Sequence, residues 1–590
     1  MRDFFKTMFA SMLGFFLTIL LFFLFIGILI SSVASSVNRT EEVEANSVLE
    51  LKLSGAVPER LADNPFEGFN QGPLADAAPA VGLEQIIWGL EKAAKDNKIK
   101  GVVLRADYYA GGLGTAEEIR QQILAFRKSG KFVYAYADIL TDGGFYIASA
   151  CDKVYLNPKG FVEFNGFAGQ VMLYKGLLDK LGVEFEVFKA GKYKSAVEPF
   201  TRNELSEPNK EQIRQYVTEL YGHHLKQIAL SRNLDSGALA ETSNLFKART
   251  AAKALEFKLV DGLKYYDEFE DELRSKLGIK EKDKKINKSS FAAYSKNAKS
   301  SKTGNDKIAV IYANGEIAMG KNESGDAIGG ESLAQTIRKA RLDKNIKAVV
   351  LRVNSPGGSS NASDIIAREV ELCKKEKPVI VSFGNVAASG GYYIACVADS
   401  IFAYPNTITG SIGVFALVPN TQKMYKQHLG LSYETVPTGE YAVTWRPDQG
   451  LTPAMRSYFQ GMVDEIYTDF ISIVGRGRHI DTGRVAELAQ GHVYTAMHAK
   501  TLGLVDGFGG LQRSIQSAAW KAKLKDYRLV SWPEMKSPIE LLFGDKSKSM
   551  LDEKLAESEL GPLFKAFGQA NSVLKMTGPQ MRMPWEIQVQ

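Results

Sequence analysis

In the second half of the chain, apolar residues cluster in short runs separated by amphipathic stretches. The runs at 307–315, 348–354 and 378–384 are almost continuously apolar, which predicts strands buried on both faces of a sheet. The stretch SDIIAREVELCKKEK repeats apolar positions at helical spacing, which predicts a helix that begins near Ser363 or Asp364. Such alternation of strands and helices indicates an α/β fold, with a sheet covered on both faces.

The most apolar run of the chain, Met8–Ile30, contains no charged residue. It is long enough to cross a hydrocarbon layer of ~30 Å. Arg2 and Lys6 precede it, which favours an N-terminus that stays on the cytoplasmic side. We therefore expect residues 1–40 to be a short cytoplasmic stub and a single transmembrane anchor, with the rest of the chain outside the cytoplasm. A signal peptide cleaved near the small residues of 31–37 is the alternative.

The strand and helix pattern occurs twice. Residues 99–107 (IKGVVLRAD) match 346–354 (IKAVVLRVN) at an offset of 247, and the same offset aligns Asp142, in the sequence DGG, with Ser389, in the sequence SGG. No gap is needed over the whole stretch between these matches. The chain therefore contains two copies of one structural unit.

The 590 residues exceed what one hydrophobic core normally organises, in agreement with two domains. We expect a first domain at 45–274, a Lys-rich linker at 275–306, a second domain at 307–524 and a tail of open role at 525–590. Residues 275–307 hold ten Lys against three acidic residues, a local charge of +7, whereas the whole chain carries +6. The remaining sequence is thus close to neutral, which argues against a nucleic-acid partner. The three cysteines show no CxxC spacing, so neither a disulfide framework nor a metal site is expected.

Ser389 follows a predicted strand and opens a helix predicted over SGGYYIACVA (389–398), with glycines directly after it. Backbone N–H groups at a helix N-terminus favour developing negative charge. If Ser389 attacks a carbonyl, the N–H of Gly390 and an N–H of Gly357 or Gly358 in the turn NSPGG are candidate oxyanion donors. The alternative is that Ser389 only caps the helix and that the glycines only allow the turn.

A serine nucleophile needs a base, and none of the six histidines lies in a motif that resembles part of a triad. A desolvated lysine is the other common base, because burial disfavours its charged form. The repeat aligns AGKYKSAVEPF with TGEYAVTWRPD and places Lys194 opposite Ala442. The first copy thus has lysine where the second has alanine, and the second has Ser389 where the first has Asp142. We therefore predict that Lys194 and Ser389 meet at the interface between the two domains.

The motifs VVLRVNSPGGS, AASGGYYIA, NTITGSIGVF and GKYKSAVEPF together resemble the signal peptide peptidase A (protease IV) family in its long tandem-domain form. The resemblance covers the chain from the apolar run to about residue 520. It implies that Ser389 is the nucleophile, Lys194 the general base and Ser411 the residue that orients the lysine amine. It also implies an oxyanion hole at Gly358 with Gly390 beside it.

For the fold, the resemblance implies two tandem Clp-protease/crotonase-like domains after a transmembrane helix, assembled as a homotetramer on the membrane. For the function, it implies a serine endopeptidase of the bacterial inner membrane that degrades cleaved signal peptides on the periplasmic side, without cofactor or metal. Two alternatives stay open: a crotonase-type acyl-CoA enzyme, which shares the fold, and a membrane-tethered scaffold with inactive domains.

Overall fold

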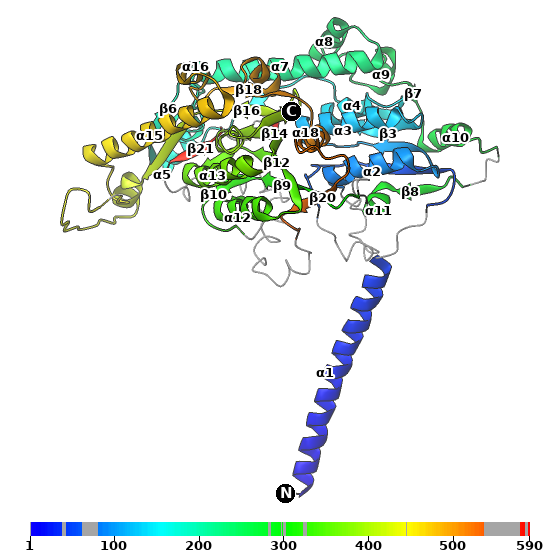
Figure 1. Ribbon diagram of the computed structural model, residues 1–590, viewed down its shortest axis with the longest axis horizontal. Coiled ribbons are helices and arrows are strands. Elements are labelled where there is room, and N and C mark those ends of the chain that lie inside the picture. The colour runs from blue at the N-terminus through cyan, green and yellow to red at the C-terminus, as the bar shows by residue number, and fades with distance from the viewer. Residues whose placement is uncertain are drawn as a thin grey trace.

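A computed structural model describes residues 2–37, 43–61, 81–280, 285–296, 298, 303–322, 327–443, 445–535, 579–583 and 588–589. Most of the predicted tail and part of the predicted linker lie outside these ranges. In Figure 1 helix α1 (Arg2–Val37) extends away from a single α/β body. Within the described part of the chain, no helix is long and apolar enough to cross a lipid bilayer. The anchor at 1–40 therefore stays a prediction.

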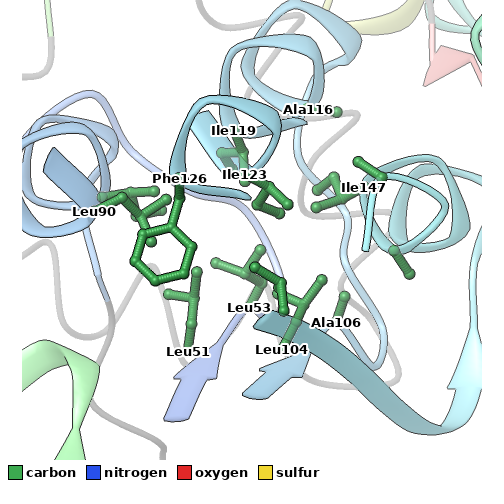
Figure 2. Close-up of a cluster of buried hydrophobic side chains, with 14 of the residues drawn as sticks. Leu51, Leu53, Leu90, Leu104, Ala106, Ala116, Ile119, Ile123, Phe126 and Ile147 are labelled. Atoms are coloured by element: carbon green, nitrogen blue, oxygen red, sulfur yellow. The ribbon is translucent and has the colours of Figure 1, made fainter. Parts of the chain in front are cut away.

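The first copy is built on a six-stranded parallel sheet with the order β7-β4-β3-β2-β1-β8. Helices α2, α3 and α4 bury apolar side chains against it, and Figure 2 shows Ile119, Ile123 and Phe126 of α3 above Leu51 and Leu104 of the strands. The elements are β1 (Ser47–Lys52), β2 (Ile99–Arg105), β3 (Phe132–Leu140), β4 (Lys153–Val162), β7 (Gly262–Leu263), β8 (Lys288–Ser290), α2 (Leu83–Lys95), α3 (Leu113–Arg127) and α4 (Asp142–Ala148).

The second copy repeats this order. Its strands run β20-β9-β12-β14, and β14 continues to β15 and β19 on one path and to β16 and β18 on another. The predicted strands at 307–315, 348–354 and 378–384 are confirmed, whereas helix α13 begins at Ser360, three or four residues before the predicted start. The strands are β9 (Lys307–Asn314), β12 (Ile346–Ser355), β14 (Val379–Ala388), β15 (Ser400–Ala403), β16 (Ile408–Gly410), β18 (Val493–Thr495), β19 (Gly507–Phe508) and β20 (Arg528–Trp532), and α13 covers Ser360–Glu376.

The edge strands β8 and β20 occupy equivalent places, each parallel to the first strand of its copy. Both lie outside the domain ranges expected from the sequence, β8 within the predicted linker and β20 within the predicted tail. Helix α11 (Phe291–Ser295) also falls in the predicted linker, and it packs on α2 so closely that a methyl group at Gly89 would lie 2.6 Å from the Phe291 ring. Part of the Lys-rich segment is therefore an integral piece of the first copy.

A third sheet joins the two copies, with the order β11-β10-β13-β21-β17-β6. Strand β6 of the first copy pairs antiparallel with β17 of the second over seven residue pairs. This pairing carries the segment that follows β6, which contains Lys194, onto the second copy. The strands are β6 (Glu184–Ala190), β10 (Glu316–Ala318), β11 (Ala327–Gly329), β13 (Gly357–Ser359), β17 (Val414–Asn420) and β21 (Gln580–Arg582).

The other described elements cover the sheets or connect them. They are α5 (Lys175–Leu181), α6 (Glu198–Thr201), α7 (Glu207–Arg232), α8 (Ser236–Asn244), α9 (Ala251–Glu256), α10 (Tyr266–Lys276), α12 (Gly330–Leu342), α14 (Gly390–Tyr393), a π-helical turn (Met424–His428), α15 (Pro453–Arg478), α16 (Thr482–Leu488), α17 (Ala496–Thr501), α18 (Leu511–Lys521), β5 (Gly169–Gln170) and β22 (Gln588–Val589).

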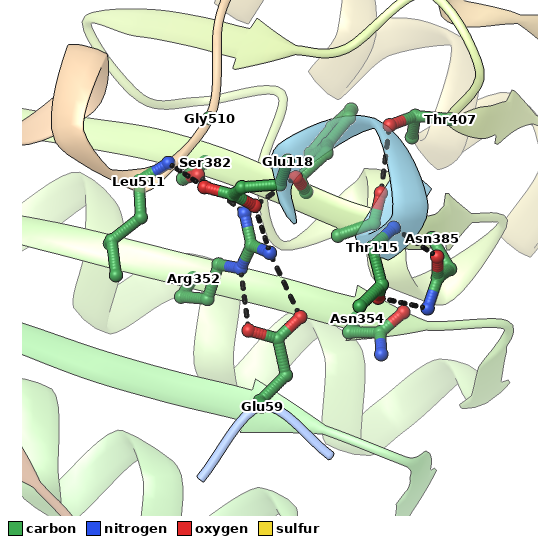
Figure 3. A network of polar contacts seen from close by, with 12 residues as sticks. Glu59, Thr115, Glu118, Arg352, Asn354, Ser382, Asn385, Thr407, Gly510 and Leu511 are labelled. Atoms are coloured by element: carbon green, nitrogen blue, oxygen red, sulfur yellow. Dashed lines mark hydrogen bonds and ion pairs between the residues drawn. The ribbon is translucent and has the colours of Figure 1, made fainter. Parts of the chain in front are cut away.

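A buried polar network holds the two copies against each other (Figure 3). The Arg352 guanidinium of β12 donates to both carboxylate oxygens of Glu59, at 2.9 Å each, and to Glu118 of α3 at 2.8 Å. Its remaining donors reach the Ser382 hydroxyl and the Phe383 carbonyl. All five N–H groups are thus used, as a buried guanidinium requires. Both acidic partners belong to the first copy, so this ion cluster fixes the relative position of the copies.

Candidate active site

Ser389 lies between the end of β14 and the start of α14, and its side chain is fully buried. Its backbone has φ 54° and ψ −117°, held in place by the hydrogen bond from its N–H to the Gly410 carbonyl at 2.8 Å. A positive φ at a residue other than glycine costs about 1–3 kcal/mol and occurs preferentially at functional positions. The helix that follows covers Gly390–Tyr393 only, so the longer helix predicted from the sequence is wrong.

Lys194 of the first copy reaches Ser389 of the second. Its Nζ lies 2.8 Å from Ser389 Oγ, 3.0 Å from Ser411 Oγ and 3.0 Å from the Ser411 carbonyl oxygen. A neutral amine has two N–H donors and one lone pair. The three contacts match this inventory if Nζ donates twice to Ser411 and accepts from the Ser389 hydroxyl.

Burial lowers the pKa of Lys194 well below its ordinary value, because the charged ammonium form is poorly solvated there. Its side chain has no measurable exposure to solvent. A nearby carboxylate would raise the pKa of Lys194, but in the described structure no ion pair joins Lys194 to a carboxylate. The site therefore favours the neutral amine, which is the form that can accept a proton.

Two glycines let the Lys194 segment approach the second copy. Gly191 follows β6 with φ +110°, and a methyl group there would lie 2.5 Å from the backbone of Gln490. Gly491 has φ +73°, and a methyl group there would lie 2.7 Å from Lys194 Cβ. The Tyr193 N–H donates to the Gln490 carbonyl at 2.8 Å, which closes the contact. The lysine is thus positioned by backbone contacts between the copies.

The turn after β12 faces the turn after β14. The Gly357 N–H donates to Ser355 Oγ at 3.2 Å, which leaves Gly358 as the candidate donor of this turn. A side chain is impossible at Gly358, because its φ is +153° and a methyl group would lie 2.0 Å from the Ile317 carbonyl. A methyl group at Gly357 would lie 2.6 Å from Gly390 N, so the two glycine turns are in direct contact. The two glycines expected to form the oxyanion hole, Gly358 and Gly390, thus belong to turns that touch, and their role stays a prediction.

Comparison with known sequences extends this picture. The profile described as "Peptidase family S49" matches residues 125–280 and 371–525, one match in each copy. The chain belongs to peptidase family S49. It is a serine-type peptidase, and the resemblance to the signal peptide peptidase A (protease IV) family is confirmed.

Long relatives of this S49 peptidase match over most of their length. "Protease 4" of Salmonella typhi is 34% identical over 551 residues, covering 90% of this chain and 87% of the relative. "Protease 4" of Haemophilus influenzae is 34% identical, covering 84% of this chain and 82% of the relative. "Serine protease SPPA, chloroplastic" of Arabidopsis thaliana is 33% identical, covering 84% and 72%. A solved ClpP1 mutant from Listeria monocytogenes aligns at 14% identity with a TM-score of 0.24, covering 35% of this chain and 94% of its own, which is too weak a likeness to decide the fold.

The first S49 copy has a different chemistry at the position equivalent to Ser389. Asp142 begins α4 and is buried, with the His224 ring nitrogen 3.8 Å from its carboxylate. Burial raises the pKa of Asp142 to about 8 and lowers the pKa of His224 to about 3, so both groups are neutral at pH 7. His224 stacks on the ring of Tyr146. The first copy thus keeps the turn, but at the position of the serine it has Asp142, a neutral carboxylic acid beside the neutral imidazole of His224.

Sequence reasoning missed one residue that supports the site. Gln212 of α7 donates from Nε2 to the Tyr193 carbonyl at 3.1 Å and to Ser195 Oγ at 2.9 Å, on either side of Lys194. Its Oε1 accepts from the Val493 N–H of β18 in the second copy. A buried glutamine inside an amphipathic helix gives no sequence signal of this kind, because its partners lie in other segments of the chain. Among the described contacts of Ser389 Oγ, the side-chain partner is Lys194 Nζ.

Proposed function

We propose that this S49 peptidase is a membrane-anchored endopeptidase that cuts peptide bonds with a Ser389/Lys194 dyad and degrades cleaved signal peptides. The observation that carries the proposal is the 2.8 Å contact between Lys194 Nζ and Ser389 Oγ, two side chains that are fully buried. A buried lysine with a lowered pKa is a suitable base for a serine hydroxyl near neutral pH.

The reaction is acyl transfer. Lys194 takes the proton of the Ser389 hydroxyl as Oγ attacks the peptide carbonyl, while the N–H groups of Gly358 and Gly390 stabilise the oxyanion. The protonated lysine then gives its proton to the leaving amine. Water, deprotonated by the same lysine, hydrolyses the acyl-enzyme and regenerates Ser389. Ser411 keeps the amine aimed at Ser389 through both steps, by accepting two hydrogen bonds from Nζ.

The cellular part of the proposal comes from the sequence and from the family resemblance. The uncharged run Met8–Ile30 after Arg2 and Lys6 supports attachment to the bacterial inner membrane, with both S49 copies on the periplasmic side. Peptides derived from membrane-spanning signal sequences would be released at that surface. The resemblance further suggests Clp-protease/crotonase-like domains and assembly as a homotetramer.

The test is hydrolysis of a fluorogenic peptide by the detergent-solubilised full chain. Ser389→Ala and Lys194→Ala should each lower kcat by at least about a thousandfold, since each removes a group that acts in the chemical step. Lys192→Ala is the matched control, because Lys192 lies two residues away and its charge is exposed. Full activity of Lys194→Ala, or equal losses in Lys192→Ala and Lys194→Ala, would refute the dyad.

A further inference from the structure

A strand from the predicted tail lies inside the sheet next to the candidate active site. Strand β21 runs antiparallel to β13, with Gly358 opposite Met581 and Ser359 opposite Gln580, and it pairs on its other side with β17 through Phe415. The side chains of Gln580, Met581 and Met583 are at most 5% exposed. The segment 579–583 therefore fills a slot between β13 of the SPGG turn and β17 of the second copy.

The register brings the Met581 carbonyl to the candidate oxyanion hole. The Met583 N–H donates to the Pro356 carbonyl at 2.7 Å, and Ser360 Oγ donates to the Pro579 carbonyl at 3.0 Å. Because hydrogen-bonded pairs alternate along an antiparallel ladder, Gly358 and Met581 form such a pair, and the Gly358 N–H donates to the Met581 carbonyl.

The close approach of glycine positions to Met581 agrees with this register. A methyl group at Gly357 would lie 2.1 Å from the Met581 oxygen, and one at Gly390 would lie 3.0 Å from it. The Met581 oxygen thus lies beside both glycine turns, where the carbonyl of a bond about to be cut is expected.

The side chains of the segment occupy sites that a peptide would also use. Met581 packs into the core of the second copy, and Met583 lies in a separate apolar cluster. Between them, Arg582 Nη1 contacts Glu316 Oε1 of β10 at 3.0 Å. The apolar cluster around Met583 contains Tyr216, Leu220, Ala388 and Val493. The alternation of apolar, basic and apolar side chains matches the two-residue period of an extended peptide.

We propose that the segment Pro579–Met583 is a built-in inhibitor that occupies the peptide groove as an added strand, with Met581 in the place of the residue whose carbonyl is attacked. This inference rests on the proposed peptidase function. A peptide substrate binding by strand addition needs the same edges of β13 and β17, so the segment and the substrate exclude each other. Covalent attachment gives such a segment an effective concentration in the millimolar range, so release or displacement of the segment controls access to Ser389.

The test compares point variants of the segment in the full chain. Met581→Asp places a charge in an apolar site, and Arg582→Glu opposes Glu316, so each should weaken binding of the segment. Met535→Asp is the matched control, because Met535 is a half-exposed methionine outside the groove. We expect kcat/KM for a fluorogenic peptide to rise at least fivefold in both groove variants and to change less than twofold in the control.

A binding measurement keeps the inhibitor and the peptidase function separable. The fluorescently labelled peptide GPQMRMPW, which copies residues 578–585, should bind Met581→Asp at least fivefold more tightly than wild type, by fluorescence anisotropy. Equal affinity for both proteins, or kcat/KM at or below wild type in both folded groove variants, would overturn the inhibitor. Peptide hydrolysis that does not depend on Ser389 would overturn the proposed function. The anisotropy result would then still test whether residues 579–583 occupy the peptide groove.

Discussion

The buried guanidinium of Arg352 gives a quantitative prediction about how the two copies are held together. Arg352→Met removes five N–H donors and leaves the carboxylates of Glu59 and Glu118 buried at the interface without their cation. Removing one partner of a buried ion pair costs about 3–5 kcal/mol. With a urea m-value of about 3 kcal/mol/M, this loss lowers the midpoint of unfolding by about 1–1.7 M.

The repeat supplies a matched control. Arg105 occupies the equivalent position in the first copy and pairs with Asp107 at 3.0 Å and Asp138 at 3.3 Å, but its side chain is 22% exposed and that of Asp138 is 52% exposed. Exposed pairs contribute about 0–1 kcal/mol, so Arg105→Met should move the midpoint by less than about 0.4 M. Urea unfolding followed by tryptophan fluorescence measures both variants.

The pH dependence of the Arg352→Met effect is a further check. Burial already raises the pKa of Glu118 with Arg352 opposing this shift, so removing the arginine raises it further. A carboxyl with a raised folded-state pKa loses stability as pH rises above its unfolded value of about 4.3. The stability loss should thus be larger at pH 8 than at pH 5. Equal losses for Arg105→Met and Arg352→Met would show that the interface cluster has no special role.

Three other predictions concern the site and the equivalent position in the first copy. Because burial lowers the pKa of Lys194, activity should persist at neutral pH and be lost as pH falls through that lowered value; a pH–rate profile that requires pH above 10 would contradict this. Gly491→Ala should lower kcat at least tenfold, because its methyl group meets Lys194 Cβ. Gly430→Ala is the control, because Gly430 also has a positive φ but no atom lies within 4 Å of the added methyl group. Similar kcat values for the two variants would refute the role of Gly491 in positioning Lys194. Because the pKa of Asp142 is raised to about 8, wild type should lose stability as pH rises from 4 to 8. Asp142→Asn should remove up to about 1.4 kcal/mol per pH unit of this decline, measured by urea unfolding at several pH values. Parallel plots of stability against pH for the two proteins would contradict this prediction.

The central strands were predictable because each is a continuous apolar run, and such runs have few alternatives to a buried strand. The contact between Lys194 and Ser389 was predictable for a different reason: the repeat shows one residue replaced in each copy, and this points to a shared site. Neither inference depended on how backbone segments far apart in the sequence pair with each other.

The parts that escaped prediction depend on backbone pairing over long distances. The pairing of β6 with β17 joins residues more than 200 positions apart, and no side-chain pattern specifies it. Strand β21 pairs with the backbone of Gly357 and Gly358, and because glycine has no side chain, the sequence does not indicate which strand pairs there. The residues after Tyr393 are buried on all sides, so they lack the amphipathic pattern that would have marked the end of α14.

The most direct test of the central claim is covalent labelling of the full chain with a small phosphonofluoridate, followed by intact and peptide mass spectrometry. We predict one label per chain, located on Ser389, with a labelling rate at pH 7.5 that falls at least a hundredfold in Lys194→Ala and is unchanged in Lys192→Ala. A label on another residue, or a Ser389 labelling rate that does not depend on Lys194, would contradict activation of the second copy's serine by the first copy's lysine.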